Sequence, residues 1–215
     1  MKITLKDKSI KEYDKSLSII DIAYDISEGL GRVCCGGIVD GKMCDLRTII
    51  DKDCTLEIVT PNDPEGLSTI RHTCSHVLAE AVKRVFPDAK LAIGPSIENG
   101  FYYDIDHAPF SREDLDRLEA EMKKIIKEGA KLEKFILPRQ EAIEFVKKME
   151  EPYKVELIED LPQDSEISFY RMGDFVDLCA GPHIVSTKSI KAFKLISSSM
   201  AYWRGDSNKA QLQRI

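Results

Sequence analysis

The sequence lacks the features that would place it in several broad classes of protein. No apolar run approaches the roughly 20 residues that a membrane-spanning helix requires, and residues 1–7 lack the apolar core of a signal peptide. There is no internal repeat and no low-complexity tract. Hydrophobic residues make up 43% of the chain, which is enough to form real cores. We therefore expect a folded, soluble, cytoplasmic protein with no membrane partner.

A strongly positive charge is also absent, because the formal net charge is -6. This argues against wholesale coating of nucleic acid, but it leaves room for local basic patches that could meet a phosphate backbone. The six cysteines are expected to be reduced thiols, since the cytosol does not sustain a disulfide framework. We expect Cys34, Cys35, Cys44 and Cys54 to be small buried hydrophobes in a β-rich unit, and Cys74 to be a core residue.

The first 60 or so residues predict a compact unit of strands around one helix. Ser18, followed by Asp21, resembles a capping box and starts a helix that Gly29 can end. The strands are expected at residues 2–5, 10–13, 33–39, 42–46 and 55–59. The order strand, strand, helix, strands is typical of a ubiquitin-like β-grasp. Residues 61–66, rich in proline, then interrupt the periodic patterns as an inter-domain linker would.

The remaining residues predict a larger α/β domain, so that the whole chain belongs to the α+β class. Helices are expected at three places: at residues 67–86, from the capping residue Ser111 to Gly129, and from Pro138 to Met149. Strands are expected at residues 91–97, 101–105, 153–158, 167–171, 175–178, 190–197 and 200–204, the first two forming a hairpin. The last residues carry no capping signal, which is typical of a boundary within a longer protein.

Histidine is scarce, and three of the four histidines fall into one spaced pattern. His72 and His76 lie four apart on the predicted helix 67–86, on the side opposite its apolar stripe. Cys179 and His183 form a Cys-x-x-x-His loop that could bring a thiol and a third imidazole against them. The fourth histidine, His107, is expected to be a solvated loop residue.

Three interpretations of this four-residue set remain open at this stage. The side chains could be ordinary hydrogen-bonded core residues, or they could close a structural zinc site of the Cys/His3 type. They could also form a reactive cluster, with or without a metal. Gly181-Pro182 favours the reactive cluster, because a tight loop holds Cys179 and His183 on one rim and exposes backbone N–H groups that could meet an anionic oxygen.

Further motifs in the same order resemble the N-terminal half of the bacterial threonyl-tRNA synthetase family, over essentially the whole chain. The motifs are Arg71-His72-Thr73-Cys74-Ser75-His76, Ile93-Gly94-Pro95, Asn99-Gly100-Phe101-Tyr102-Tyr103-Asp104, Asp177-Leu178-Cys179-Ala180-Gly181-Pro182-His183 and Tyr202-Trp203-Arg204-Gly205-Asp206. The resemblance implies a TGS domain at residues 1–61 and an editing domain, related to that of alanyl-tRNA synthetase, at residues 62–215. The class II catalytic core and the anticodon-binding domain of the family would follow residue 215, so aminoacylation is not expected.

The resemblance also implies a hydrolytic function. Threonine and serine differ by one methyl group, which is worth only about 1–3 kcal/mol in a binding pocket, so a synthetase needs a second site that removes misattached serine. By family likeness, this chain is expected to hydrolyse mischarged seryl-tRNA(Thr) to serine and tRNA and to spare threonyl-tRNA. The implied partners are tRNA(Thr), especially its aminoacylated 3' end, and the rest of the synthetase chain.

The family assigns roles to the four-residue set. His72 is expected to orient or deprotonate a water molecule, with His183 as a competitor for that role and His76 completing the pocket. Cys179 is expected to shape the site and bind substrate or water, and a covalent thioester is a less favoured alternative.

Three further residues match family positions. Lys154 is expected to stabilise the developing oxyanion, although a lone strand lysine is more commonly a solvated edge charge. Asp177 is expected to bind the seryl amino group or hydroxyl. Tyr103 is expected to line the pocket or pack against the adenosine.

The cofactor expectation also comes from the resemblance. Alanyl-type relatives hold zinc with the corresponding four groups, whereas the threonyl branch is understood to work without it. We therefore expect no cofactor to be required for editing, while zinc at His72, His76, Cys179 and His183 stays open. The main alternative function is a non-catalytic RNA-binding or regulatory module with a structural zinc site; a free-standing trans-editing protein is a third interpretation.

Contacts with RNA need cations for phosphates and aromatic faces for bases. Candidates are Lys188, Lys191, Lys194, Arg204, Tyr202 and Trp203. The alternative for this group is a solvated sheet edge with one buried tryptophan.

Overall fold

The computed structural model describes residues 1–215 and divides into two compact units. The first unit consists of residues 1–73 and 181–185, and the second of residues 74–180 and 186–215. Helix α3 (Pro64–Val85) begins in the first unit and continues in the second. None of the helices has the length and hydrophobicity needed to cross a membrane.

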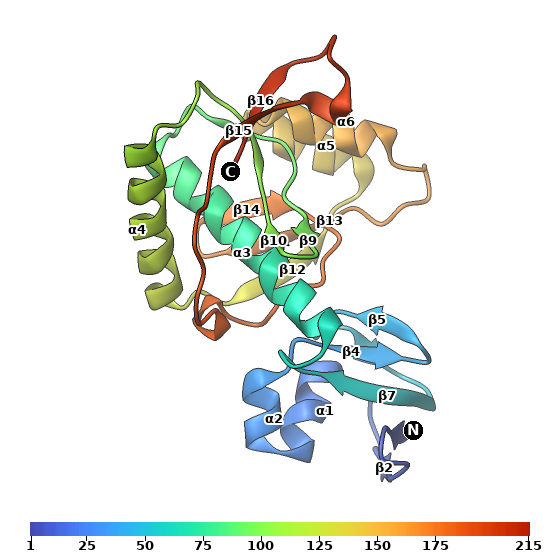
Figure 1. Cartoon of the computed structure of the whole chain (residues 1–215). Coiled ribbons are helices and arrows are strands. Elements are labelled where there is room, and N and C mark those ends of the chain that lie inside the picture. The colour runs from blue at the N-terminus through green and yellow to red at the C-terminus, as the bar shows by residue number, and fades with distance from the viewer. The chain divides into compact units, whose positions relative to one another are not determined.

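The first unit contains a five-stranded sheet and two short helices, drawn in blue to teal in Figure 1. The strand order is β2-β1-β7-β4-β5, in which β1 and β7 run parallel and the other neighbours antiparallel. The elements are β1 (Lys2–Leu5), β2 (Ile10–Glu12), β3 (Leu17–Ser18), α1 (Ile19–Ile26), α2 (Glu28–Val33), β4 (Gly36–Val39), β5 (Lys42–Cys44), β6 (Ile49–Ile50) and β7 (Cys54–Val59). This order confirms the predicted β-grasp arrangement.

The helical part of the first unit differs from the prediction. Ser18 caps α1 as expected, by accepting from the N–H of Asp21. The helix ends at Ile26 and not at Gly29, because the hydroxyl of Ser27 accepts from the N–H of Leu30 and so begins a second helix. That helix extends to Val33, so the following strand begins at Gly36 and not at residue 33.

The second unit arranges three small sheets and three further helices with the continuation of α3. The sheets have the orders β15-β16-β11-β8, β12-β13-β14 and β10-β9. The elements are β8 (Lys90–Leu91), β9 (Ser96–Ile97), β10 (Gly100–Phe101), β11 (Asp104–Asp106), α4 (Arg112–Glu128), β12 (Leu132–Ile136), α5 (Arg139–Lys148), α6 (Pro152–Asp160), β13 (Ser168–Met172), β14 (Phe175–Leu178), the short 3-10 helices η1 (Thr187–Ser189) and η2 (Trp203–Gly205), β15 (Ser199–Tyr202) and β16 (Gln211–Arg214).

Helix α4 shows why its ends were predictable. Ser111 and Asp114 form a complete capping box, with each side chain bonded to the backbone of the other. Gly129 ends the helix in the left-handed conformation, at a φ of 70°, which a residue without Cβ adopts without strain. Both signals are local, so they act wherever the helix packs.

Residues 153–158 form part of helix α6, and the predicted strand is wrong. Pro152 occupies the first turn of the helix, where its missing N–H costs no hydrogen bond. Tyr153, Lys154 and Ile158 are the buried residues of this helix. A short apolar run cannot be assigned to strand or helix by periodicity alone, and here the proline was the better signal.

The strand predicted at residues 190–197 is also absent. The N–H of Leu195 donates to the Glu119 carboxylate on α4, and Lys194 forms an ion pair with the same carboxylate. Ile196 is 82% exposed. The backbone N–H of Leu195 is therefore satisfied by a side chain instead of a neighbouring strand, which sequence periodicity does not encode.

Candidate functional site

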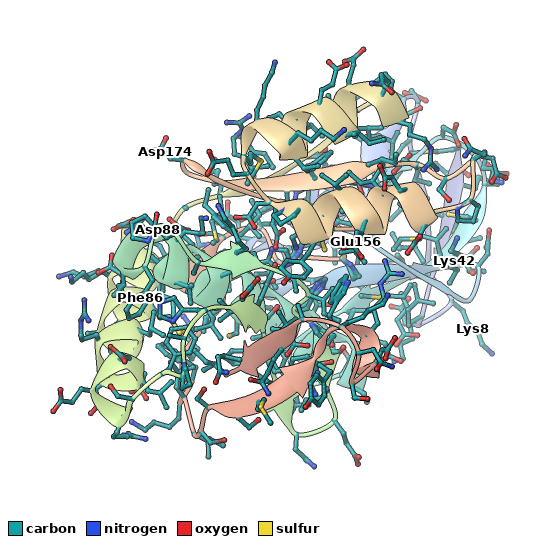
Figure 2. All side chains as sticks on the ribbon, turned by 90° about the horizontal axis from the view of Figure 1, so that it is seen from above. Lys8, Lys42, Phe86, Asp88, Glu156 and Asp174 are labelled. Carbon is teal, nitrogen blue, oxygen red and sulfur yellow. The ribbon has the colours of Figure 1, made fainter.

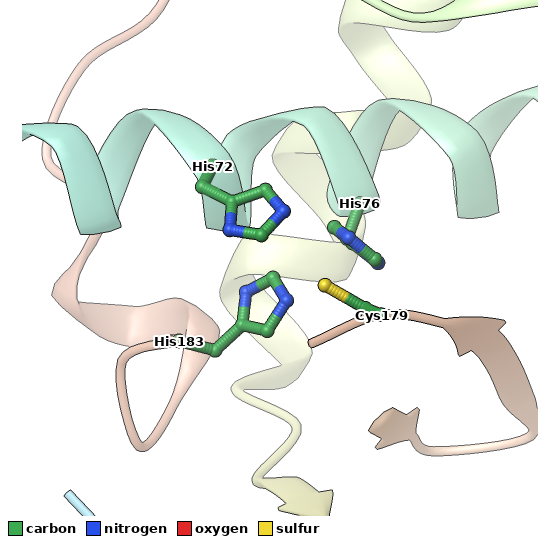
Figure 3. A group of neighbouring side chains, drawn as sticks. All are labelled: His72, His76, Cys179 and His183. Carbon is green, nitrogen blue, oxygen red and sulfur yellow. The ribbon is translucent and has the colours of Figure 1, made fainter. Parts of the chain in front are cut away.

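Four side chains that the sequence singled out lie together (Figure 3). His72 and His76 come from α3, Cys179 follows β14 directly, and His183 lies in the loop after it. Each offers one ligand atom, and these atoms all lie within 4.8 Å of one another. His76 and His183 are buried, while His72 and Cys179 are half-buried. We call these four residues the His/Cys cluster; that they come together confirms the expectation drawn from the two spacings.

His72 and His183 form a stacked pair, with ring centroids 4.3 Å apart. The Nδ1 of His72 lies 3.2 Å from the carbonyl oxygen of Pro182. Because a carbonyl only accepts hydrogen bonds, this Nδ1 carries the proton. In the neutral ring the Nε2 of His72 is therefore left with a lone pair.

A different contact indicates that His183 also carries its proton on Nδ1. Its Nδ1 lies 3.1 Å from the hydroxyl oxygen of Thr73. That hydroxyl has one proton, which it donates to the carbonyl of Thr69 one helical turn earlier, at 3.0 Å. Thr73 must then accept from His183, so the neutral ring again keeps its lone pair on Nε2.

His76 is supported by a carboxylate instead of a neutral oxygen. Its Nδ1 lies 3.3 Å from Oδ2 of Asp177. All three imidazoles thus use Nδ1–H to hold an oxygen acceptor and present Nε2 to other groups. This is the arrangement of histidines that either move protons or bind a metal ion.

Asp177 lies at the centre of a buried charge network that includes Lys154 and Tyr103. The ammonium of Lys154 is 2.7 Å from Oδ1 of Asp177, and the Tyr103 hydroxyl donates to Oδ2 at 2.6 Å. Lys154 also donates to the Tyr103 hydroxyl at 2.8 Å. Asp177, Lys154 and Tyr103 are at most 4% exposed.

The network sets the ionisation of its members. Burial alone would raise the pKa of Asp177, but the charges of Lys154 and His76 and the hydrogen bonds from Lys154 and Tyr103 outweigh it, so that the pKa lies below its usual value. Burial and the neighbouring Asp177 charge raise the pKa of Tyr103 well above its usual value. Asp177 is therefore ionised and Tyr103 neutral over the physiological range.

This geometry bears on the roles predicted for the three residues. Lys154 lies on a helix and is buried in an ion pair, so the alternative of a solvated strand-edge charge is wrong. The Tyr103 side chain is fully buried, so in this structure it supports Asp177 and offers no face to an adenosine. Asp177 already accepts three hydrogen bonds, one of which holds His76.

Backbone N–H groups at the two ends of the Cys179–His183 loop are held by hydrogen bonds. The N–H of Cys179 donates to Ser168, that of His183 to Asp45, and that of Ile184 to Thr73. These three N–H groups hold the loop in place and are therefore not the ones that could meet an anionic oxygen.

A cavity of about 500 Å³ in the second unit borders the charge network on Lys154 and Asp177. None of the other residues that line this cavity was expected at a functional site from the sequence. Glu80 could have been found, because it follows His76 by four residues and so continues the same face of α3. The remaining lining residues are Lys83, Arg84, Leu91, Val146, Met149, Glu151, Asp174, Phe175, Val176 and Leu178. Figure 2 shows Asp174 in the turn between β13 and β14.

Of the other cysteines, Cys34, Cys35, Cys54 and Cys74 are buried as expected, whereas Cys44 is only half-buried. Cys34 and Cys54 are part of the hydrophobic core of the first unit. Burial raises the pKa of the thiols of Cys34, Cys35 and Cys74, to about 11 for the first and about 12 for the other two. Such thiols stay protonated at neutral pH and are poor metal ligands.

The packing of His107 and Trp203 decides two further expectations. His107 is half-buried and stacks on Phe110 at 4.6 Å and against Phe86 at 4.8 Å, so its description as a solvated loop residue is wrong. Trp203 is buried, and its Nε1 donates to Glu156 on α6, labelled in Figure 2. The alternative of a buried tryptophan is therefore confirmed, and no base can stack on this ring.

The His/Cys cluster also fits a metal ion by the chemistry of its donors. Three imidazole nitrogens and one thiolate are an accepted ligand set for zinc. Each imidazole is oriented by an oxygen acceptor on its other nitrogen, as is usual for zinc-bound histidine. The cluster could therefore hold a metal ion.

Comparisons with known proteins give the same assignment as the motifs. Residues 1–60 match the TGS domain, and residues 167–215 match the family described as threonyl and alanyl tRNA synthetase second additional domain. Threonine–tRNA ligases of Acetivibrio thermocellus, Clostridium botulinum and Clostridioides difficile are 59%, 58% and 56% identical to the chain over 216 residues. Each alignment covers 100% of this chain but only 33–34% of the relative.

The chain thus spans about a third of the length of the curated relatives that it matches. Both domain families match in the order that the motifs predicted, and the fold of the first unit agrees with the first of them. On this evidence the chain belongs to the threonine–tRNA ligase family, in which it represents the N-terminal region with its TGS domain and editing-type domain.

Proposed function

We propose that this chain hydrolyses the ester that joins serine to the 3'-terminal adenosine of tRNA(Thr), and that it spares the threonyl ester. The observation that carries the proposal is the His/Cys cluster, in which three imidazoles use Nδ1–H to hold oxygen acceptors and leave Nε2 for proton transfer. We take residues 62–215 as the editing domain and the rest of a synthetase chain as its partner.

Ester hydrolysis requires an activated water, a polarised carbonyl and a proton for the departing ribose oxygen. In our mechanism the Nε2 of His72 takes a proton from water, and the water oxygen bonds to the ester carbonyl carbon. When the bond from that carbon to the ribose oxygen breaks, the same imidazolium returns the proton to the ribose oxygen. Serine and tRNA with a free hydroxyl are the products.

The other residues of the site support this step. His183 stacks on His72 and is the competing base, since its neutral ring also carries its lone pair on Nε2. His76 is oriented by Asp177 and completes the pocket. Cys179 shapes the pocket and binds substrate or water without forming a thioester. Lys154 uses two of its three N–H donors within the network, so one remains to stabilise negative charge on the carbonyl oxygen.

We further propose that hydrolysis requires no metal ion, because the three imidazoles can themselves supply the base and the acid. Zinc, if bound by the four residues, would activate a water molecule as a Lewis acid. A second candidate function follows from the same donor set: a non-catalytic RNA-binding or regulatory module whose cluster holds structural zinc. Removal of zinc would unfold such a module.

The test is to incubate the full chain with seryl-tRNA(Thr) and threonyl-tRNA(Thr) in parallel. Rapid loss of the seryl ester with little loss of the threonyl ester is expected. The assay should include high enzyme concentrations, because the other domains of a synthetase would normally add to the affinity for tRNA. Hydrolysis of seryl-tRNA(Thr) no faster than in buffer, even at saturating enzyme, would reject the proposal in favour of the binding module.

A further inference from the structure

The loop that carries His183 belongs to the first unit, together with the β-grasp fold. Two side chains of the β-grasp form hydrogen bonds with the backbone of the loop at His183 and at the next residue. Oδ2 of Asp45 accepts from the N–H of His183 at 3.0 Å, and Arg47 donates to the carbonyls of His183 and Ile184 at 3.1 Å and 3.0 Å. Val185 packs against the hydrophobic core of the β-grasp.

Asp45 and Arg47 also hold each other. The backbone N–H of Arg47 donates to Oδ1 of Asp45 at 2.8 Å, and its guanidinium lies 3.0 Å from the same oxygen. Both side chains are largely buried, with 9% and 21% exposed. We call this pair the Asp45–Arg47 clamp. Because bonds to charged groups are shorter and stronger than neutral ones, the clamp is a firm support for the loop.

The clamp is fixed in turn by the fold of the small domain. It lies in the turn after β5, where the N–H of Thr48 donates to the carbonyl of Asp45. Leu46, between the two clamp residues, is fully buried in the core, and its carbonyl accepts from Ile20 at the start of α1. The backbone that carries the clamp is therefore held in place by the fold of the small domain.

From these contacts we infer that Asp45 and Arg47 are positioning residues for His183, so that the TGS domain helps to build the hydrolytic site. The inference rests on the proposed function. The clamp fixes the backbone at residues 183 and 184, and Thr73 fixes the ring through Nδ1. Together they set where the lone pair on Nε2 points. When a group that aligns the reacting atoms is displaced by roughly 1 Å, the rate of the reaction falls about 100-fold.

The first experiment measures single-turnover deacylation of seryl-tRNA(Thr) by the full chain carrying Arg47→Ala or Arg47→Lys. Both variants are expected to lower kcat about 10- to 100-fold, with KM little changed, because lysine cannot reproduce the two-pronged contact of the guanidinium. Arg32→Ala is the matched control. Arg32 lies in the same domain and pairs only with Glu28 on the surface, so this variant should keep the wild-type rate.

The second experiment reads the position of His183 without any activity. Two-dimensional ¹H–¹⁵N spectra of the imidazoles distinguish a ring protonated on Nδ1 from its tautomer. The wild-type chain should show His183 in the Nδ1–H form, and Arg47→Ala should shift its signals or mix the tautomers, while Arg32→Ala should not. Arg47→Lys serves in place of Arg47→Ala if thermal unfolding shows that the alanine variant is not folded.

The two experiments separate failure of the inference from failure of the proposed function. Unchanged His183 signals and an unchanged kcat in the Arg47 variants would overturn the inference, even though the wild type hydrolyses the ester. If the wild type is inactive, the proposed function fails, and the spectra alone decide whether the clamp positions His183. Altered signals then support the clamp, and unaltered signals reject it.

Discussion

The histidines of the site are supported in two different ways. His72 and His183 rest on neutral oxygens, a backbone carbonyl and a threonine hydroxyl. His76 rests on the ionised carboxylate of Asp177, which Lys154 and Tyr103 hold in place. A neutral acceptor fixes the tautomer but stabilises the charged ring less than a carboxylate does.

This difference bears on which histidine acts as the general base and which one is a structural support. A general base must accept a proton and release it again within one turnover, and we propose His72, with His183 as its competitor, for this role. His76 is tied to a buried network whose removal would disturb the fold as well as the chemistry. The predictions below separate the two groups, beginning with the largest expected effect.

The largest effect is expected from loss of the proposed base. His72→Ala should lower kcat for deacylation of seryl-tRNA(Thr) by about 10²- to 10⁴-fold, the range that general acid–base groups contribute. Thermal unfolding should change little, because His72 is half-buried and its partner is a backbone carbonyl. His107→Ala is the control, since the fourth histidine packs on Phe86 and Phe110 outside the cluster.

His183→Ala sharpens the same test. A much smaller loss of kcat than for His72→Ala would leave His72 as the base, and the reverse order would assign that role to His183. Equal activity of His72→Ala and the wild-type chain would contradict the mechanism.

Lys154→Met is expected to act on stability. It removes the ammonium and leaves Asp177 as a buried charge without its ion-pair partner, a change that costs about 3–5 kcal/mol in the free energy of unfolding. Urea denaturation measures the difference. Lys134→Met removes a more exposed ion pair, with Glu166, and should cost less than about 1 kcal/mol. Similar midpoints for the two variants would show that the network around His76 is not a structural support.

Tyr103→Phe should have a smaller, pH-dependent effect. The pKa of Asp177 lies below its usual value, so its ionisation stabilises the folded state above a pH of about 4 and this contribution is lost as the pH falls through the folded pKa. Loss of the Tyr103 hydroxyl raises that pKa toward its usual value and costs about 1–2 kcal/mol at neutral pH.

Acid denaturation followed by circular dichroism measures this effect. The variant should unfold at a higher pH than the wild-type chain. An unchanged acid midpoint would mean that the hydroxyl contributes nothing to the ionisation of Asp177.

The predictable parts of this molecule were those encoded by local signals. Ser111 and Gly129 fixed both ends of α4 because capping depends on a few adjacent residues. The His/Cys cluster followed from two spacings of four, since one helix and one tight loop each bring two side chains to the same side. The resemblance then added Lys154, Asp177 and Tyr103.

The parts that could not be predicted depend on contacts between distant residues. Leu195 lies outside any strand because Glu119 satisfies its backbone, and no periodic pattern contains that information. The same holds for the Asp45–Arg47 clamp, which lies about 136 residues from its target and carries no motif. Tyr103 was expected to line the pocket or pack against the adenosine, yet its side chain is fully buried against Asp177, and burial cannot be inferred from a match to a family position.

The most direct test of the account is to measure zinc content and deacylation on the same preparation of the full chain, before and after exhaustive chelation. The account predicts that hydrolysis of seryl-tRNA(Thr) continues at the same rate after chelation, and that the thermal unfolding midpoint stays unchanged. Stoichiometric zinc whose removal abolishes hydrolysis or unfolds the domain would contradict it, because the cluster would then hold a metal ion and not act through its imidazoles alone.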